Sequence, residues 1–236
     1  MATEAVTVDA GSPQQRALIH AGGIAALGLG ASYIAVTLLY SVVGLVPTET
    51  GEAWLTYLDG KAVAWWGIVL LSALTDLLFL PLAAALYIVL KRLDRNLTLA
   101  GAGLLVLFAV LDLAVTQIGF AGLITLSSDY AAATSDAERA VAVAAASYPV
   151  AMFRSILFAI YVIGIPAIGI LLLSLVMRGG PFGQIVVWTG ILTGVFGAAA
   201  VTVPLVWSDF GYGAIVAAVL TTLWVLLVGW RLARWR

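Results

Sequence analysis

The sequence predicts an all-α membrane protein, a polytopic chain that folds as one six-helix transmembrane bundle. Apolar residues gather in six long stretches, and hydrophobic residues make up 63% of the chain against 10% for charged residues. A soluble domain carries about 25% charged residues, and a bilayer core needs roughly 20 apolar residues in a helix. The predicted spans are Ala17–Val46, Ala62–Leu90, Leu97–Leu126, Val150–Met177, Ile185–Trp207 and Tyr212–Leu232.

The first span is expected to start ahead of the membrane. Ser12 has the position of an N-cap, Pro13 that of a first helical residue, and Gln15 can close a capping box. Residues 1–12 are therefore interpreted as a short tail and residues 13–236 as a single transmembrane domain, since the loops are too short to fold alone. A short turn around Asp94-Arg95-Asn96 joins the second and third spans, which predicts that they are antiparallel neighbours.

A further helix is predicted between the third and fourth spans. Ser135-Asp136-Ala137-Glu138 is a capping-box pattern, which predicts a helix from about Asp136 to Tyr148. A straight helix from Asp136 to Met177 would be about 63 Å long, more than a bilayer accepts. A bend is therefore expected at Pro149, with the first part at the outer interface. The alternative is an alanine-rich linker.

The glycines of the fifth span carry a packing signal. Gly190 and Gly194 lie four residues apart, the spacing that lets two helices approach closely. This favours packing within the bundle over the alternative, a contact in a homo-oligomer.

The basic residues predict the orientation. Cytoplasmic loops of membrane proteins carry an excess of Lys and Arg. One side has eight basic residues against two on the other, Lys61 and Arg139, so both termini are expected in the cytoplasm of a cell-membrane protein. The eight are Arg16, Lys91, Arg92, Arg95, Arg178, Arg231, Arg234 and Arg236.

Several function classes are excluded by composition. The chain has no cysteine and one histidine, His20, which excludes thiolate chemistry, iron–sulfur clusters and multi-histidine metal sites. The net charge of −1 provides no attraction to nucleic acid. Phosphate-loop, zinc-protease and nucleophile-elbow motifs are absent from the sequence. No cofactor and no metal are therefore expected, and a non-enzymatic role is favoured.

The chain resembles a six-helix integral membrane family of bacteria and archaea, an uncharacterised domain of unknown function. The resemblance covers nearly the whole chain. It rests on the segment Ser128–Arg139, on the LYIVLKRL end of the second span and on Pro181-Phe182-Gly183. It implies the six-helix fold and carries over no catalytic residue.

The candidate site consists of three charged residues inside the spans. Asp76 lies fifteen residues from both Lys61 and Lys91, and Asp112 lies seventeen from both Arg95 and Asp129, so both carboxyl groups are expected at mid-membrane depth. Arg154 is expected nearer the outer side, pointing inward to pair with at least one of them, because buried carboxylates need a cation. Headgroup snorkelling is the alternative for Arg154.

Polar residues around this trio support a site. Ser72, Thr116 and Tyr161 are candidates for supporting roles, and Gln117 is expected to hydrogen-bond within the bundle. Pro81 lies about one turn from Asp76, and broken helices at mid-membrane occur at transporter sites.

Three functions stay open at this level. The leading one is binding or transport of a small solute through an outward-facing polar pocket. The second is a structural or interaction subunit in which the trio only fixes helix packing. The third is an intramembrane hydrolase with Asp76 and Asp112 as a proton-sharing dyad. The expected partners are the lipid bilayer and a small solute.

Overall fold

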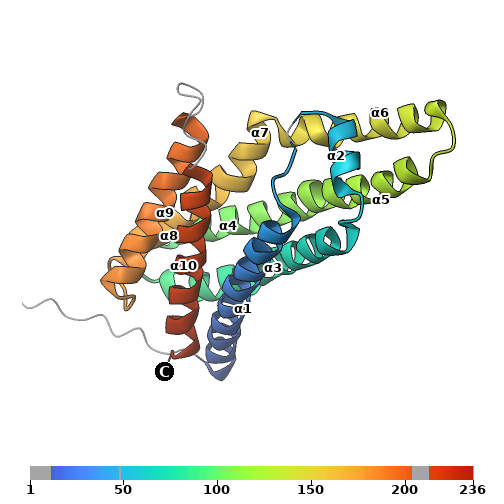
Figure 1. The fold of residues 1–236 in the computed structure, drawn as a ribbon. Helices are drawn as coiled ribbons and strands as arrows, with labels where there is room; N and C mark the ends of the chain where they lie inside the picture. Colours follow the sequence, from blue (N-terminus) through green and yellow to red (C-terminus); the bar gives the residue numbers. More distant parts are fainter. Residues whose placement is uncertain (1–11, 48, 204–212, 236) are drawn as a thin grey trace, which may run out of the picture.

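The computed structural model describes residues 12–47, 49–203 and 213–235, and within these ranges every regular element is helical (Figure 1). Six helical segments there are long and apolar enough to cross a membrane. Four of the segments are single helices: α1 Pro13–Val43, α3 Ala62–Leu90, α9 Gln184–Thr202 and α10 Gly213–Ala233. The third segment consists of α4 Arg95–Leu111, the π-helical turn η1 Asp112–Gln117 and α5 Ile118–Ala132. The fourth segment consists of α7 Ile156–Ala159, the π-helical turn η2 Ile160–Gly164 and α8 Ile165–Met177. Two further helices, α2 Gly51–Leu58 and α6 Asp136–Phe153, lie between them.

The six membrane-length segments contact one another in chain order, as a ring. Helix α1 packs on α3, α3 on α4, α4 on α8, α8 on α9, α9 on α10, and α10 on α1. The predicted antiparallel contact between the second and third spans is therefore confirmed. The outer parts of the last two predicted spans, residues 204–207 and 212, fall outside the described residues.

The two ends of the bundle differ in charge. The turn that carries Lys91 and Arg92 and ends at Arg95 meets the segment after α8, since Gly180 lies against Leu93. That segment also meets the end of α10, since Gly183 lies against Arg231. We call this the basic end. At the other, acidic end, α2 and α6 pack against each other and against α5 (Figure 1).

Each end has its own apolar core. The basic-end core joins α1, α3, α4, α8, α9 and α10 around Leu29, Phe79, Leu105 and Trp224. The acidic-end core joins the end of α1, α2, the start of α3, α5 and α6, and is rich in aromatic rings. Its members include Trp54, Trp65, Phe120 and Phe153, with ring centroids 4.5 to 6.2 Å apart.

Several helix starts and contacts follow the sequence pattern. Helix α1 begins at Pro13, with Ser12 accepting from the Gln15 amide, and the capping box of Ser135 and Glu138 starts α6. In α9, Gly190 lies against Ser174 and Trp224, and Gly194 against Leu171 and Ala167, so both glycines pack inside the bundle.

The expected bend at Pro149 is wrong. Helix α6 continues through Pro149 to Phe153, and the chain breaks at Arg154 and Ser155 instead. A proline removes one backbone hydrogen bond without forcing a helix to end. The new helix starts at Ser155 because its hydroxyl accepts from the Phe158 amide at 3.1 Å.

Candidate functional site

A cavity of about 430 Å³ lies inside the ring of helices, lined by residues of α1, α3, α4, η1, η2, α8 and α10. It exists because α1 and α10 touch at the basic end and separate toward the acidic end. A β-carbon on Gly229 would lie 2.9 Å from the Leu27 backbone nitrogen, and one on Gly23 would clash with the Ala233 backbone. Such small residues allow the close contact, and beyond Gly30 and Leu226 the two helices diverge (Figure 1).

Aromatic rings bound the cavity on its basic-end side. Phe79 follows Asp76 by three residues and contacts Phe108 edge-on, with ring centroids 5.4 Å apart. Tyr33 of α1 contacts Phe79 in the same way at 6.5 Å. These rings belong to the basic-end core or pack against it, so the cavity is closed toward that end.

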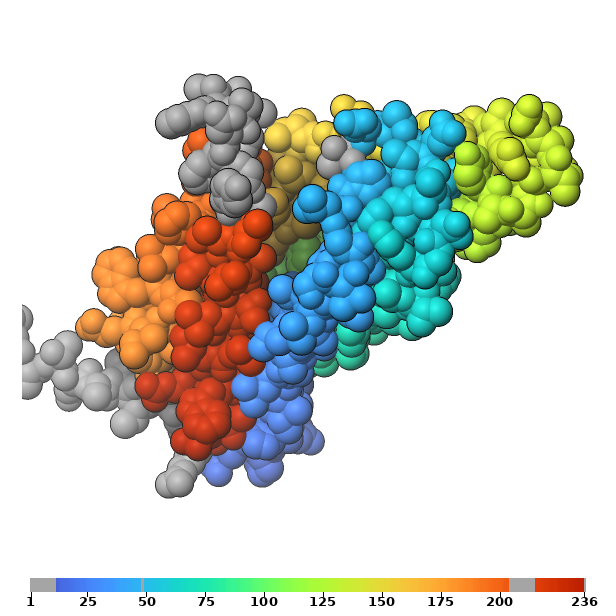
Figure 2. Space-filling view, in the orientation of Figure 1, coloured from blue at the N-terminus to red at the C-terminus, as the bar shows by residue number. Residues whose placement is uncertain are grey.

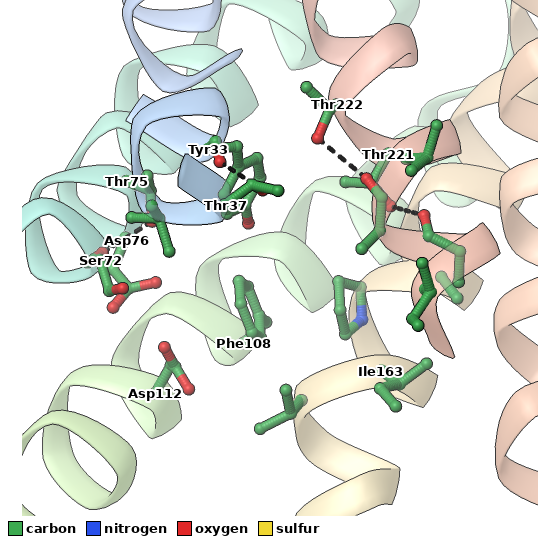
Figure 3. A pocket seen from close by; sticks show the side chains of 18 of the residues that line it. Tyr33, Thr37, Ser72, Thr75, Asp76, Phe108, Asp112, Ile163, Thr221 and Thr222 are labelled. Atoms are coloured by element: carbon green, nitrogen blue, oxygen red, sulfur yellow. Dashed lines mark hydrogen bonds between the residues drawn. The ribbon is translucent and has the colours of Figure 1, made fainter. Parts of the chain in front are cut away.

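Asp76 and Asp112 both line the cavity, as the sequence predicts for two carboxyl groups at one depth (Figure 3). Asp76 lies in the middle of α3, and its side chain is 1% exposed. Neither of its carboxyl oxygens has a hydrogen-bond partner among the described residues. Asp112 begins η1 and is 8% exposed.

Asp112 differs from Asp76 because it has a fixed partner. The Gln117 amide nitrogen donates to Asp112 Oδ2 at 2.8 Å, which confirms the predicted hydrogen bond of Gln117 within the bundle. The two residues are five apart, the spacing that aligns in a π-helix and not in an α-helix. The π-helical turn η1 is therefore what joins Gln117 to Asp112.

A second π-helical turn faces the first. Tyr161 of η2 and Thr116 of η1 share a hydrogen bond of 3.0 Å between their hydroxyl groups. Neither residue lines the cavity, whereas Ser72, the third supporting candidate, does. Thr116 and Tyr161 thus hold together the two interrupted helices beside the site.

The predicted pairing of Arg154 with the carboxyl groups is wrong. Arg154 is exposed and caps the end of α6, and its Nη1 donates to the backbone carbonyl of Glu49 at 3.0 Å. The pairing assumed that the fourth span starts at Val150, whereas the break at residues 154–155 leaves Arg154 among the acidic-end loops. The cavity has no Lys, Arg or His among its described lining residues.

Sequence reasoning missed the contributions of α1 and α10. Tyr33 and Thr37 from α1 line the cavity beside Thr75 and Asp76, and Thr221 and Thr222 from α10 line it on the other side (Figure 3). The two adjacent threonines, Thr221 and Thr222, interrupt the last apolar span and could have indicated from the sequence that α10 lines the cavity. No three His, Cys, Asp or Glu residues gather as a metal site in the part of the chain that the structure describes.

Fold and cavity together define a class: an all-α protein with six membrane-length helices around a cavity that holds two carboxyl groups. No family model, no curated protein and no solved structure matches this chain. The resemblance to the six-helix family therefore stays a prediction.

Proposed function

We propose that this chain is a multi-pass protein of the cell membrane that binds a small cationic solute in its central cavity, with Asp76 as the counter-ion. The single observation that carries the proposal is the environment of the Asp76 carboxyl group. It is almost completely buried, lines a cavity large enough for a small organic molecule, and has no partner among the described residues for either carboxyl oxygen.

The energetics of burial favour a positively charged ligand. An unpaired carboxylate in an apolar site costs several kcal/mol, and here two carboxyl groups share one cavity whose described lining residues include no basic one. The missing positive charge must come from a bound cation or from protons. Tyr33, Tyr40 and Phe108 line the same cavity, and aromatic faces attract cations.

The surrounding helices favour transport over fixed binding. Pro81 lies inside α3, Pro166 is the second residue of α8, and η1 and η2 interrupt the α-helical pattern beside the cavity. Interrupted helices around a mid-membrane site are typical of transporters, in which such segments rearrange.

Thermal unfolding in detergent solution with butylammonium chloride as the probe tests the proposal. A ligand that binds only the folded state raises the unfolding midpoint. We expect butylammonium to raise the midpoint of the unmodified protein, and neither sodium butyrate nor butanol to do so. Asp76→Asn should abolish the shift. The matched control Glu52→Gln removes one carboxylate from the exposed start of α2 and should retain it. An equal shift in Asp76→Asn, or no shift at all, would contradict the proposal.

An intramembrane hydrolase is the second candidate. The position of Arg154 outside the cavity removes the cation that would have kept both Asp residues ionised, and a proton-sharing dyad requires its absence. The hydrogen bond from Gln117 to Asp112 weighs against two equivalent carboxyl groups. Cleavage of a fluorogenic transmembrane peptide that is lost in both Asp76→Ala and Asp112→Ala would favour the hydrolase.

A further inference from the structure

The cavity has a side opening between α1 and α10. Figure 2 shows a hollow between these two helices, with deeper helices visible inside it. Thr37 of α1 and Ala218 of α10 both line the cavity and are both exposed, so the wall is open between them. The contacts of Gly23, Gly30 and Gly229 close the same seam at the basic end. We call the gap beside Thr37 and Ala218 the α1–α10 opening.

This opening faces the apolar part of a bilayer. It lies within two segments of membrane-spanning length, Pro13–Val43 and Ile215–Ala233. The neighbouring outward side chains are large and apolar, since Ile34 and Leu38 on α1 are 49% and 62% exposed, and Val219 on α10 is 62% exposed. Exposed side chains of this kind are typical of a surface that contacts lipid.

The polar side chains at the opening do not require a polar ligand. The hydroxyl groups of Thr37, Thr221 and Thr222 each donate to the carbonyl four residues earlier in their own helix, at 2.8 to 2.9 Å. Their hydrogen-bonding needs are therefore met, and they present mainly methyl groups. Among the lining residues that the structure describes, Asp76 is the one with buried side-chain oxygens that lack a hydrogen-bond partner.

We infer that the solute is an amphiphilic monocation, an alkylammonium or arylammonium ion, that partitions into the bilayer and reaches Asp76 through the α1–α10 opening. This inference rests on the proposed function. The cavity volume of about 430 Å³ lies in the range of sites for small organic molecules and exceeds what an inorganic ion fills. The apolar wall fits a hydrocarbon body, and the carboxyl pair fits one ammonium group together with a proton on the second carboxyl group.

A chain-length comparison tests the ligand class. The chain has no native cysteine, so Ser72→Cys places a single thiol in the cavity wall. In lipid nanodiscs, labelling of this thiol by N-ethylmaleimide is measured with hexylammonium or methylammonium present. Each buried methylene group strengthens binding about fourfold, so hexylammonium should protect the thiol at a concentration at least about 100-fold lower. Asp76→Asn on the Ser72→Cys background should lose the protection.

A second arm of the experiment tests the route. On the Ser72→Cys background, Ala218→Trp places a bulky side chain in the opening. Leu223→Trp is the matched control, because Leu223 lies on the same helix, is 46% exposed and does not line the cavity. We expect the protection of the thiol by hexylammonium to develop at least about tenfold more slowly with Ala218→Trp than with Leu223→Trp. Methylammonium protection should be equal in the two variants.

The outcomes separate this inference from the proposed function. Equal protection by hexylammonium and methylammonium, both lost in Asp76→Asn, overturns the amphiphilic ligand and leaves the cation site in place. Equal hexylammonium rates in the two tryptophan variants overturn the lateral route and assign entry from water. Failure of the proposed function itself shows separately, as the absence of a butylammonium shift in detergent, where no bilayer is present.

Discussion

The two carboxyl groups of the site differ in what each contributes to stability. Asp112 accepts a hydrogen bond from Gln117 at 2.8 Å, whereas both oxygens of the more deeply buried Asp76 lack a partner among the described residues. A buried polar group without a partner destabilises the folded state, and a paired one does not. Asp76 is therefore a residue at which ligand binding and stability oppose each other, as at many functional sites.

Opposite effects on stability are expected from two substitutions at this site. Without ligand, Asp76→Asn should raise the thermal unfolding midpoint in detergent, because it removes a buried ionisable group that has no hydrogen-bond partner among the described residues. Gln117→Leu should lower the free energy of unfolding by about 1–3 kcal/mol, because it leaves the Asp112 carboxyl group unpaired. A lower midpoint for Asp76→Asn would instead indicate a structural network around Asp76.

The candidate site was only partly predictable from sequence. Asp76 and Asp112 could be found because a carboxyl group inside a long apolar run is costly and rarely without a role. The position of Arg154 could not be found, because it depends on where α6 ends. A shift of the helix break by nearly two turns, from Pro149 to Ser155, moves the Arg154 side chain from the span to the loop before α2.

At the scale of elements, the π-helical turns η1 and η2 set the geometry of the site. They lie on adjacent segments, and the hydroxyl groups of Thr116 and Tyr161 join them at 3.0 Å. Single π-helical turns often occur at functional sites because they rotate the following residues relative to an α-helix. Here η1 brings Gln117 into line with Asp112.

Energetic coupling between the two π-helical turns is the next prediction. Thr116→Val and Tyr161→Phe each remove one hydroxyl group with little change in shape, and a double-mutant cycle isolates their interaction. We expect a coupling free energy of about 0.5–1.5 kcal/mol, measured from unfolding in detergent. Additive effects of the two substitutions would mean that the turns are not energetically linked.

The start of α6 predicts a pH dependence. Hydrogen bonds from the backbone and side chain of Thr134, and then from the backbone of Ser135, lower the pKa of Glu138. A lowered pKa in the folded state means that the capping contribution is complete above the ordinary Glu pKa of about 4.3. It is lost as the pH falls through the lowered value.

Amide chemical shifts in an NMR titration check this expectation. The amide signals of Thr134 and Ser135 should change with a midpoint below the ordinary Glu value. Glu138→Gln keeps an oxygen acceptor without the charge and should flatten this titration. A midpoint at or above the ordinary Glu value would show that the capping box does not hold the carboxylate.

The helices themselves were predictable to different degrees. The long apolar runs and the N-caps at Ser12 and Ser135 mark observed helix starts, and the turn at Asp94 lies where α4 begins. Helix α2 was not predicted, because its eight residues are too few to show a helical period, and its place depends on contacts with α5 and α6. The π-helical turns leave no signature that distinguishes them from α-helix in an apolar span.

For the whole molecule, two apolar cores with a polar layer between them explain why the cavity lies where it does. The basic-end core closes the ring between Asp76 and the basic end. The acidic-end core is confined to the part of the molecule around α2, α5 and α6. The described residues of α9 and α10 take no part in the acidic-end core. The ring therefore separates between α1 and α10 at that end, which opens the cavity there (Figures 1 and 2).

The orientation of the bundle is the prediction that belongs to this scale. The positive-inside rule places the basic end, with Lys91, Arg92 and Arg95, in the cytoplasm. The α1–α10 opening then faces the outer leaflet, and an amphiphilic solute would enter from there. Single cysteines at Glu52 in α2 and at Arg95, the first residue of α4, test this in a chain without native cysteine. A membrane-impermeant maleimide applied to intact cells should label position 52, and label position 95 only after the cells are permeabilised. Labelling of position 95 in intact cells, with position 52 protected, would reverse the orientation and assign the opening to the inner leaflet.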